Sequence, residues 1–169
     1  GRDTATTYGN IGEIYLSQGA FDEALRYFQK SLAIKEKVLG MNHPNTATTY
    51  GNIAVAYFKQ RAFDKAMVYF QKALTIQEEQ LGTGHPDTAL TYVNIALIYF
   101  AQNAYDEAMS YFQKALEIQE KILGTEDPDT AVTYSYIAMS HSAKGAYEDA
   151  MAYYKKSLAI LEKTYGPRH

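Results

Sequence analysis

Apolar side chains recur along the chain at the three- and four-residue spacing of amphipathic helices. Tyr50, Ile53 and Tyr57 fall on one helical face, and this run starts at Pro44. A second run places the following residues along one side of a helix: Ala66, Phe70, Ala73, Leu74 and Gln77. We therefore predict one helix that begins at Pro44 and a second that extends from about Phe63 to Leu81.

The same pattern returns every 42 residues, because Leu39-Gly40 recurs as Leu81-Gly82 and again as Leu123-Gly124. Ala24, Ala66, Ala108 and Ala150 keep this phase, and so do Ile11, Ile53, Ile95 and Ile137. Self-similarity at a fixed period indicates a repeat architecture. Four copies account for the whole chain as a single array over 1–169, with approximate limits 1–42, 43–84, 85–126 and 127–169.

Residues with strong positional preferences lie where each helix should begin or end. Pro44 suits a first helical position, which places His43 at the N-cap; Asp127 takes that place in the fourth copy. Gly82 should close the second helix. The turns between the two helices fall at Gly19, Arg61, Asn103 and Gly145. Glycine and asparagine tolerate a left-handed backbone there, and arginine is the exception.

One helical hairpin cannot bury its two apolar faces alone, so its stability must come from contacts with neighbouring copies. Small Ala24 and Ala66 beside large Phe28 and Phe70 should let the helices approach closely. The predicted fold is all-α: a right-handed α-solenoid of four helix-turn-helix repeats. Its first helices would line an extended concave surface.

The series Tyr50, Ile53, Ala54, Tyr57, Ala66, Phe70 and Ala73 resembles the tetratricopeptide signature of aromatic, leucine, small, tyrosine, alanine, phenylalanine and alanine. The eight extra residues per repeat and the segment from Ile34 to Pro44 resemble the kinesin light chain subfamily. This resemblance implies a cytoplasmic scaffold or cargo adaptor that holds a peptide in its groove. Asn10, Asn52 and Asn94 match the second asparagine of that subfamily's Asn-Asn-Leu-Ala phrase, and Tyr136 breaks the series.

A second face of each first helix carries the candidate binding residues, by analogy with tetratricopeptide folds. We call it the apolar stripe, and it comprises Thr48, Gly51, Val55, Phe58 and Lys59 in the second copy, Leu90, Val93, Leu97 and Phe100 in the third, and Met139 in the fourth. With Asn10, Asn52 and Asn94 these residues form the predicted partner-binding site for an amphipathic helix or an extended apolar segment. The alternative is that these side chains pack against neighbouring first helices.

The composition of the chain argues against several other classes of function. The chain has no cysteine and a formal net charge of −3, and it has no apolar run long enough to span a membrane. We expect no membrane association, and no nucleic-acid binding, because phosphate neutralisation requires a basic face. His43 and His85 recur as expected helix caps in separate turns, and His141 takes the place of a packing tyrosine. We therefore predict no metal, no cofactor and no catalysis.

The ends of the predicted array lack an obvious polar capping helix, which repeat proteins normally need. Tyr154, Leu158 and Leu161 would lie partly bare on the last helix. We expect either that the chain is part of a longer array or that it associates end to end. The alternative to a partner-binding scaffold is thus a self-assembling structural module that associates through its apolar repeat ends.

Overall fold

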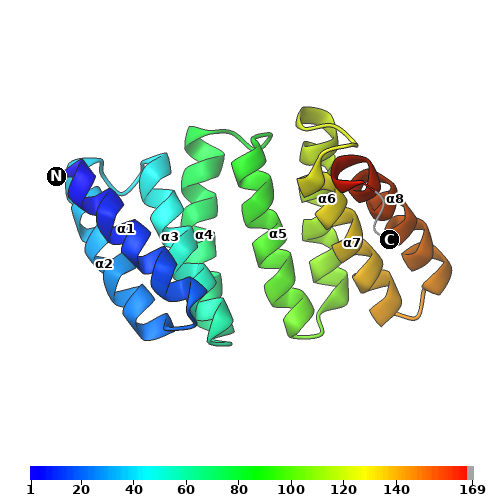
Figure 1. The fold of residues 1–169 in the computed structure, drawn as a ribbon, viewed down its shortest axis with the longest axis horizontal. Helices are drawn as coiled ribbons and strands as arrows, with labels where there is room; N and C mark the ends of the chain where they lie inside the picture. The colour runs from blue at the N-terminus through cyan, green and yellow to red at the C-terminus, as the bar shows by residue number, and fades with distance from the viewer. Residues whose placement is uncertain (167–169) are drawn as a thin grey trace. The chain divides into compact units, whose positions relative to one another are not determined.

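The computed structural model of the protein describes residues 1–166, and this part of the chain contains eight α-helices and no strand (Figure 1). It divides into two compact units, the first comprising Gly1–Thr83 and the second beginning at Gly84. The helices are α1 (Arg2–Ser17), α2 (Phe21–Val38), α3 (Pro44–Lys59) and α4 (Phe63–Gln80) in unit 1, and α5 (Pro86–Ala101), α6 (Tyr105–Ile122), α7 (Pro128–Ala143) and α8 (Tyr147–Tyr165) in unit 2. The all-α class and the four helix-turn-helix repeats are confirmed.

Three of the first helices begin at a proline behind a capping side chain, as predicted. His43 Nδ1 accepts a hydrogen bond from the Asn45 backbone N–H at 3.0 Å, and His85 Nδ1 accepts one from the N–H two residues on, also at 3.0 Å. In α7 the carboxylate of Asp127 accepts the equivalent bond at 2.8 Å. Each cap satisfies a backbone donor that the first helical turn would leave unpaired.

The hairpin turns have a left-handed residue at all four predicted positions, with φ angles of 77° at Gly19, 62° at Arg61, 63° at Asn103 and 81° at Gly145. Arg61 adopts this conformation although its Cβ disfavours it. The Arg61 backbone N–H donates to the Phe58 carbonyl at 2.9 Å, and the guanidinium lies 5.3 Å from the centre of the Phe63 ring. These contacts offset part of the cost of the left-handed backbone.

Within each hairpin, the two helices meet at small residues. In unit 1 Ala24 and Phe28 are fully buried, and a Cβ added at Gly12 would lie 2.6 Å from the Phe28 ring. The other copies have alanine at the position of Gly12, so the first hairpin is the one in which the phenylalanine ring needs this space.

The hairpins of a unit are joined where the first helix of one repeat packs on the second helix of the preceding repeat. In unit 1 the Thr46 hydroxyl donates to the Gly40 carbonyl at 2.8 Å, and the Tyr50 hydroxyl donates to Glu36 at 2.8 Å. Unit 2 repeats the arrangement, with Thr130 on Gly124 at 2.9 Å and Tyr134 on Glu120 at 2.8 Å. Helices α2 with α3 and α6 with α7 thus share the same threonine and tyrosine anchors.

The tyrosine anchor is expected to be sensitive to alkaline pH. Burial, and after it the hydrogen bond to Glu36, together raise the pKa of Tyr50 to about 12. The folded state therefore holds this proton above pH 10, where an unfolded tyrosine releases it. The resulting stabilisation is complete below about pH 10 and is lost between about pH 10 and pH 12.

We predict that Arg61→Gly raises the free energy of unfolding by roughly 0.5–1 kcal/mol, because glycine adopts a positive φ without a steric cost. Asn103→Gly is the matched control and should change stability less, because asparagine already tolerates this region. Urea unfolding followed by circular dichroism measures both variants. A loss of stability in Arg61→Gly would contradict the assignment of strain to this turn.

Tyr50→Phe should lower the free energy of unfolding by about 1–2 kcal/mol at neutral pH, because the hydrogen bond to a charged acceptor is lost. Its stability should also fall less steeply than the wild type's between pH 10 and pH 12. Tyr147→Phe, at an exposed position, is the control and should leave both properties within about 0.5 kcal/mol. Equal pH slopes for Tyr50→Phe and the wild type would refute the tyrosine anchor.

Candidate functional site

In unit 1 the apolar stripe lies on α3 and is accessible to different degrees along the helix. Thr48 and Lys59 are exposed, whereas Gly51, Val55 and Phe58 are half-buried. A Cβ added at Gly51 would meet no atom within 4 Å, so there is room for a side chain at this position. The stripe in unit 1 therefore presents apolar surface between polar ends.

In unit 2 the apolar stripe lies on α5 and α7. Leu90 is 43% exposed, and Leu97, Phe100 and Met139 are half-buried. Val93 differs because it is only 7% exposed. It therefore adds little to any surface that a partner could contact.

Val93 is buried because of where its position on the first helix points, as the equivalent positions in two other copies show. At the equivalent position in the first copy, a Cβ on Gly9 would lie 3.8 Å from the Ser31 hydroxyl of α2. In the fourth copy the hydroxyls of Ser135 and Ser157 lie 2.7 Å apart. This position thus faces the second helix of its own repeat.

Both phenylalanines of the stripe already have an aromatic neighbour. The Phe58 ring centre lies 5.5 Å from that of Phe63, and the Phe100 ring centre lies 5.2 Å from that of Tyr105 in an edge-to-face arrangement. These contacts hold each ring at the turn of its hairpin and leave part of it accessible. The two phenylalanines of the stripe are therefore neither fully exposed nor fully buried by neighbouring side chains.

Asparagine side chains accompany the stripe in both units. Asn10 on α1 is exposed, and Asn52 on α3 and Asn94 on α5 are half-buried. Within the part of the chain that the structure describes, none of these three amides has a hydrogen-bond partner. A half-buried amide with free donor and acceptor groups suits the backbone of a bound peptide.

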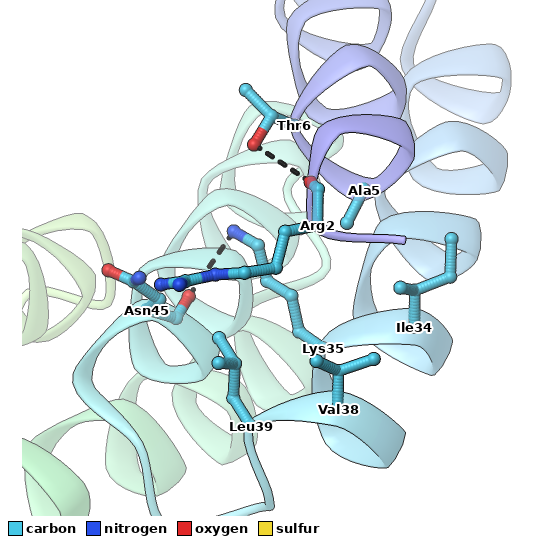
Figure 2. A pocket seen from close by; sticks show the side chains of 8 residues that line it. All are labelled: Arg2, Ala5, Thr6, Ile34, Lys35, Val38, Leu39 and Asn45. Carbon is cyan, nitrogen blue, oxygen red and sulfur yellow. Dashed lines mark hydrogen bonds between the residues drawn. The ribbon is translucent and has the colours of Figure 1, made fainter.

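Unit 1 also contains a small cationic pocket of about 180 Å³ between α1, α2 and the start of α3 (Figure 2). It is lined by Arg2, Ala5, Thr6, Ile34, Lys35, Val38, Leu39 and Asn45. The Lys35 ammonium donates to the Thr49 hydroxyl at 2.9 Å and to the Asn45 carbonyl at 3.4 Å. Burial lowers the pKa of Lys35, and the charge of Glu13 acts in the opposite direction.

Comparison with known protein families identifies the family to which this repeat architecture belongs. The family model for the tetratricopeptide repeat matches residues 3–79, 52–121 and 87–163. The chain belongs to the tetratricopeptide repeat family. Among curated proteins, none matches the sequence.

Solved structures with this tetratricopeptide fold include BtubC (BKLC) from P. vanneervenii, with a TM-score of 0.85, 23% identity, and coverage of 98% of this chain and 66% of that one. A protein described as a kinesin light chain with nearly identical TPR-like repeats, from Podosopora anserina, has a TM-score of 0.82 and 23% identity, with coverage of 100% and 80%. Aspartyl phosphate phosphatase F from Bacillus subtilis has a TM-score of 0.86 and 21% identity, with coverage of 96% and 41%. The chain therefore spans only part of BtubC and of the phosphatase.

The three histidines among residues 1–166 have structural roles. His43 and His85 cap helices, and His141 stacks on Tyr153 with ring centres 5.5 Å apart. In the earlier copies a tyrosine makes this stacking contact, for example Tyr57 on Tyr69. Among residues 1–166 no group of three or more side chains could hold a metal ion, and no helix is long and apolar enough to cross a membrane.

Sequence reasoning missed the pocket, although one substitution in the repeat pointed to it. The position of Lys35 is occupied by Gln77, Gln119 and Leu161 in the later copies.

The Gln119 side chain is 1% exposed, and within the described residues neither its Nε2 nor its Oε1 has a hydrogen-bond partner. An unpartnered buried amide costs free energy, because it has given up its hydrogen bonds to water.

We predict that Gln119→Leu raises the free energy of unfolding by about 1–3 kcal/mol, because leucine occurs at this position in the fourth copy and needs no partner. Gln113→Leu, on the exposed side of α6, is the control and should stay within about 0.5 kcal/mol of the wild type. Thermal and urea unfolding measure the difference. A destabilised Gln119→Leu would show that the amide is bonded in solution.

Proposed function

We propose that this tetratricopeptide array is a non-catalytic scaffold that binds an amphipathic helix or an extended apolar segment of a partner protein along the apolar stripe. The observation that carries the proposal is the combination of half-buried apolar side chains with asparagine amides that have no partner. Apolar side chains supply affinity, and amides with free donor and acceptor groups fix the orientation of a bound peptide backbone through hydrogen bonds.

The energetics of the stripe require both kinds of contact. Full burial of Val55, Phe58, Leu97 and Phe100 would contribute roughly 1.5–3 kcal/mol each, and less here because all four side chains are already half-buried. Association costs on the order of 4–15 kcal/mol. Asn52 and Asn94 must therefore add hydrogen bonds if the complex is to form at micromolar concentration.

Two further features support a scaffold. Tetratricopeptide repeats are generally protein-interaction modules, and one structural relative is described as a kinesin light chain. We infer an adaptor of that general kind, acting in the cytoplasm. Apart from Lys59, the side chains of the stripe and of the asparagines beside it are apolar, hydroxyl or amide groups, which suits binding better than acid–base chemistry.

A peptide array tests the proposal with three probe sets: amphipathic helical peptides, extended apolar peptides and acidic peptides. Phe58→Ser and Phe100→Ser together should reduce capture of apolar peptides at least tenfold, because each removes accessible apolar surface from the stripe. Val68→Ser, which changes an exposed apolar residue on α4, is the matched control and should bind as the wild type does.

Circular dichroism must accompany the array. Unchanged helicity with lost capture supports the proposal. Lost helicity in the double variant means that the two rings serve packing, and capture that survives the double variant rejects the stripe as the site. Preferential capture of acidic peptides, lost in Lys35→Gln, would instead place binding at the cationic pocket.

A further inference from the structure

The cationic pocket of unit 1 brings two positive charges together without a negative one. Arg2 extends from α1 and Lys35 from α2, and Figure 2 shows both side chains reaching towards Asn45 at the start of α3. Among the described residues that line the pocket, none carries a carboxylate. Within residues 1–166 neither Arg2 nor Lys35 forms an ion pair. The pocket therefore attracts an anion.

Lys35 retains a hydrogen-bond donor for such a ligand. Its ammonium carries three N–H groups, and the bonds to the Thr49 hydroxyl and the Asn45 carbonyl use two of them. Burial lowers the pKa of Lys35 and outweighs the opposing charge of Glu13, which does not line the pocket. An ammonium group that has lost part of its water is stabilised by a negative charge beside it.

Both cations depart from the repeat pattern. Proline occupies the position of Arg2 in the other three copies, and the position of Lys35 is glutamine in the second and third copies and leucine in the fourth. Helix α6 packs on α7 with the neutral Gln119 at this position, so the contact between repeats does not require a charge here. The two charged residues thus occur in the same copy and line the same pocket.

The remainder of the pocket is largely apolar, and it is small. Ile34, Val38 and Leu39 from the end of α2 form one wall, and Val38 is 52% exposed although its side chain is aliphatic. The volume of about 180 Å³ is similar to that of an apolar cavity of roughly 150 Å³ that holds benzene. The pocket is therefore suited to a ligand of about six to eight non-hydrogen atoms.

A carboxylate on a short aliphatic chain fits these groups better than a phosphate does. The planar guanidinium of Arg2 can bind both oxygens of a carboxylate, and the remaining N–H of Lys35 can donate to one of them. The aliphatic chain would then cover the apolar wall and remove Val38 from water. A phosphate group has only polar oxygens to place against that wall.

We propose that the cationic pocket binds a small aliphatic carboxylic acid, with Arg2 and Lys35 on the carboxylate and Val38 on the aliphatic chain. None of the residues that line the pocket belongs to the apolar stripe. The two sites are therefore separate, and each can be tested without the other.

A titration of the 169-residue chain with isovalerate, followed by backbone amide chemical shifts, tests the proposal. The dissociation constant should be on the order of 1 mM, because the ligand has only about seven non-hydrogen atoms. The shift changes should concentrate at the start of α1, the end of α2 and the start of α3. Isovaleramide, which has no charge, and inorganic phosphate, which has no aliphatic chain, should each bind at least tenfold more weakly.

Two variants remove the charges one at a time. Lys35→Gln introduces the side chain of the second and third copies, and Arg2→Gln replaces the guanidinium with an amide. Each should weaken isovalerate binding at least tenfold. Lys37→Gln is the matched control, because it removes an exposed lysine of the same helix outside the pocket, and it should bind as the wild type does. Circular dichroism verifies that each variant is folded.

Three results would overturn the proposal: no saturable shift change up to about 20 mM isovalerate, binding that survives Lys35→Gln, and phosphate binding as tight as that of isovalerate. The peptide acetyl-Gly-Leu carries the same aliphatic group beside a carboxylate. Binding of this peptide at least tenfold tighter than isovalerate would also overturn the proposal, because the ligand would then be a chain end and not a free acid.

The double variant Phe58→Ser with Phe100→Ser keeps this result separate from the proposed function. It should bind isovalerate as the wild type does, because neither phenylalanine lines the pocket. Loss of isovalerate binding in this variant would contradict the separation of the two sites.

Discussion

The structure depends on the contact between the second helix of one repeat and the first helix of the next. Each second helix has an apolar face that its own hairpin leaves uncovered, and in each unit the following first helix covers it. The Thr46 and Tyr50 hydroxyls fix the register of that contact in unit 1, as Thr130 and Tyr134 do in unit 2. These contacts thereby fix the first helix of each pair against the helix before it.

Much of the fold is predictable because it depends on local signals that return with the 42-residue period. Pro44 and His43 mark a helix start by the chemistry of unpaired backbone donors, and the structure has the cap at that place. The left-handed turn at Arg61 was harder to foresee, because the side chain argues against it and only the hairpin geometry requires it. The tyrosine–glutamate anchors were missed, since Tyr50 and Glu36 belong to different repeats and lack a distinctive local motif.

The candidate site was less predictable, because helical periodicity gives the face of a residue and not its depth. Val93 shares the phase of Gly51, yet it is buried against the second helix of its own repeat. Phe58 belongs to the stripe and also packs on Phe63, a contact that periodicity cannot reveal. Whether the four repeats form one array stays a prediction, as does the choice of partner.

The most direct measurement of this account is the urea unfolding of an isolated first hairpin, residues 1–42, beside residues 1–83, which form unit 1. If each hairpin is ordered by the helix that covers it, the single hairpin should show little helicity and no cooperative transition. Residues 1–83 should retain more helicity per residue. A cooperative unfolding transition in residues 1–42 alone would contradict the account, because the hairpin would then be stable without its neighbour.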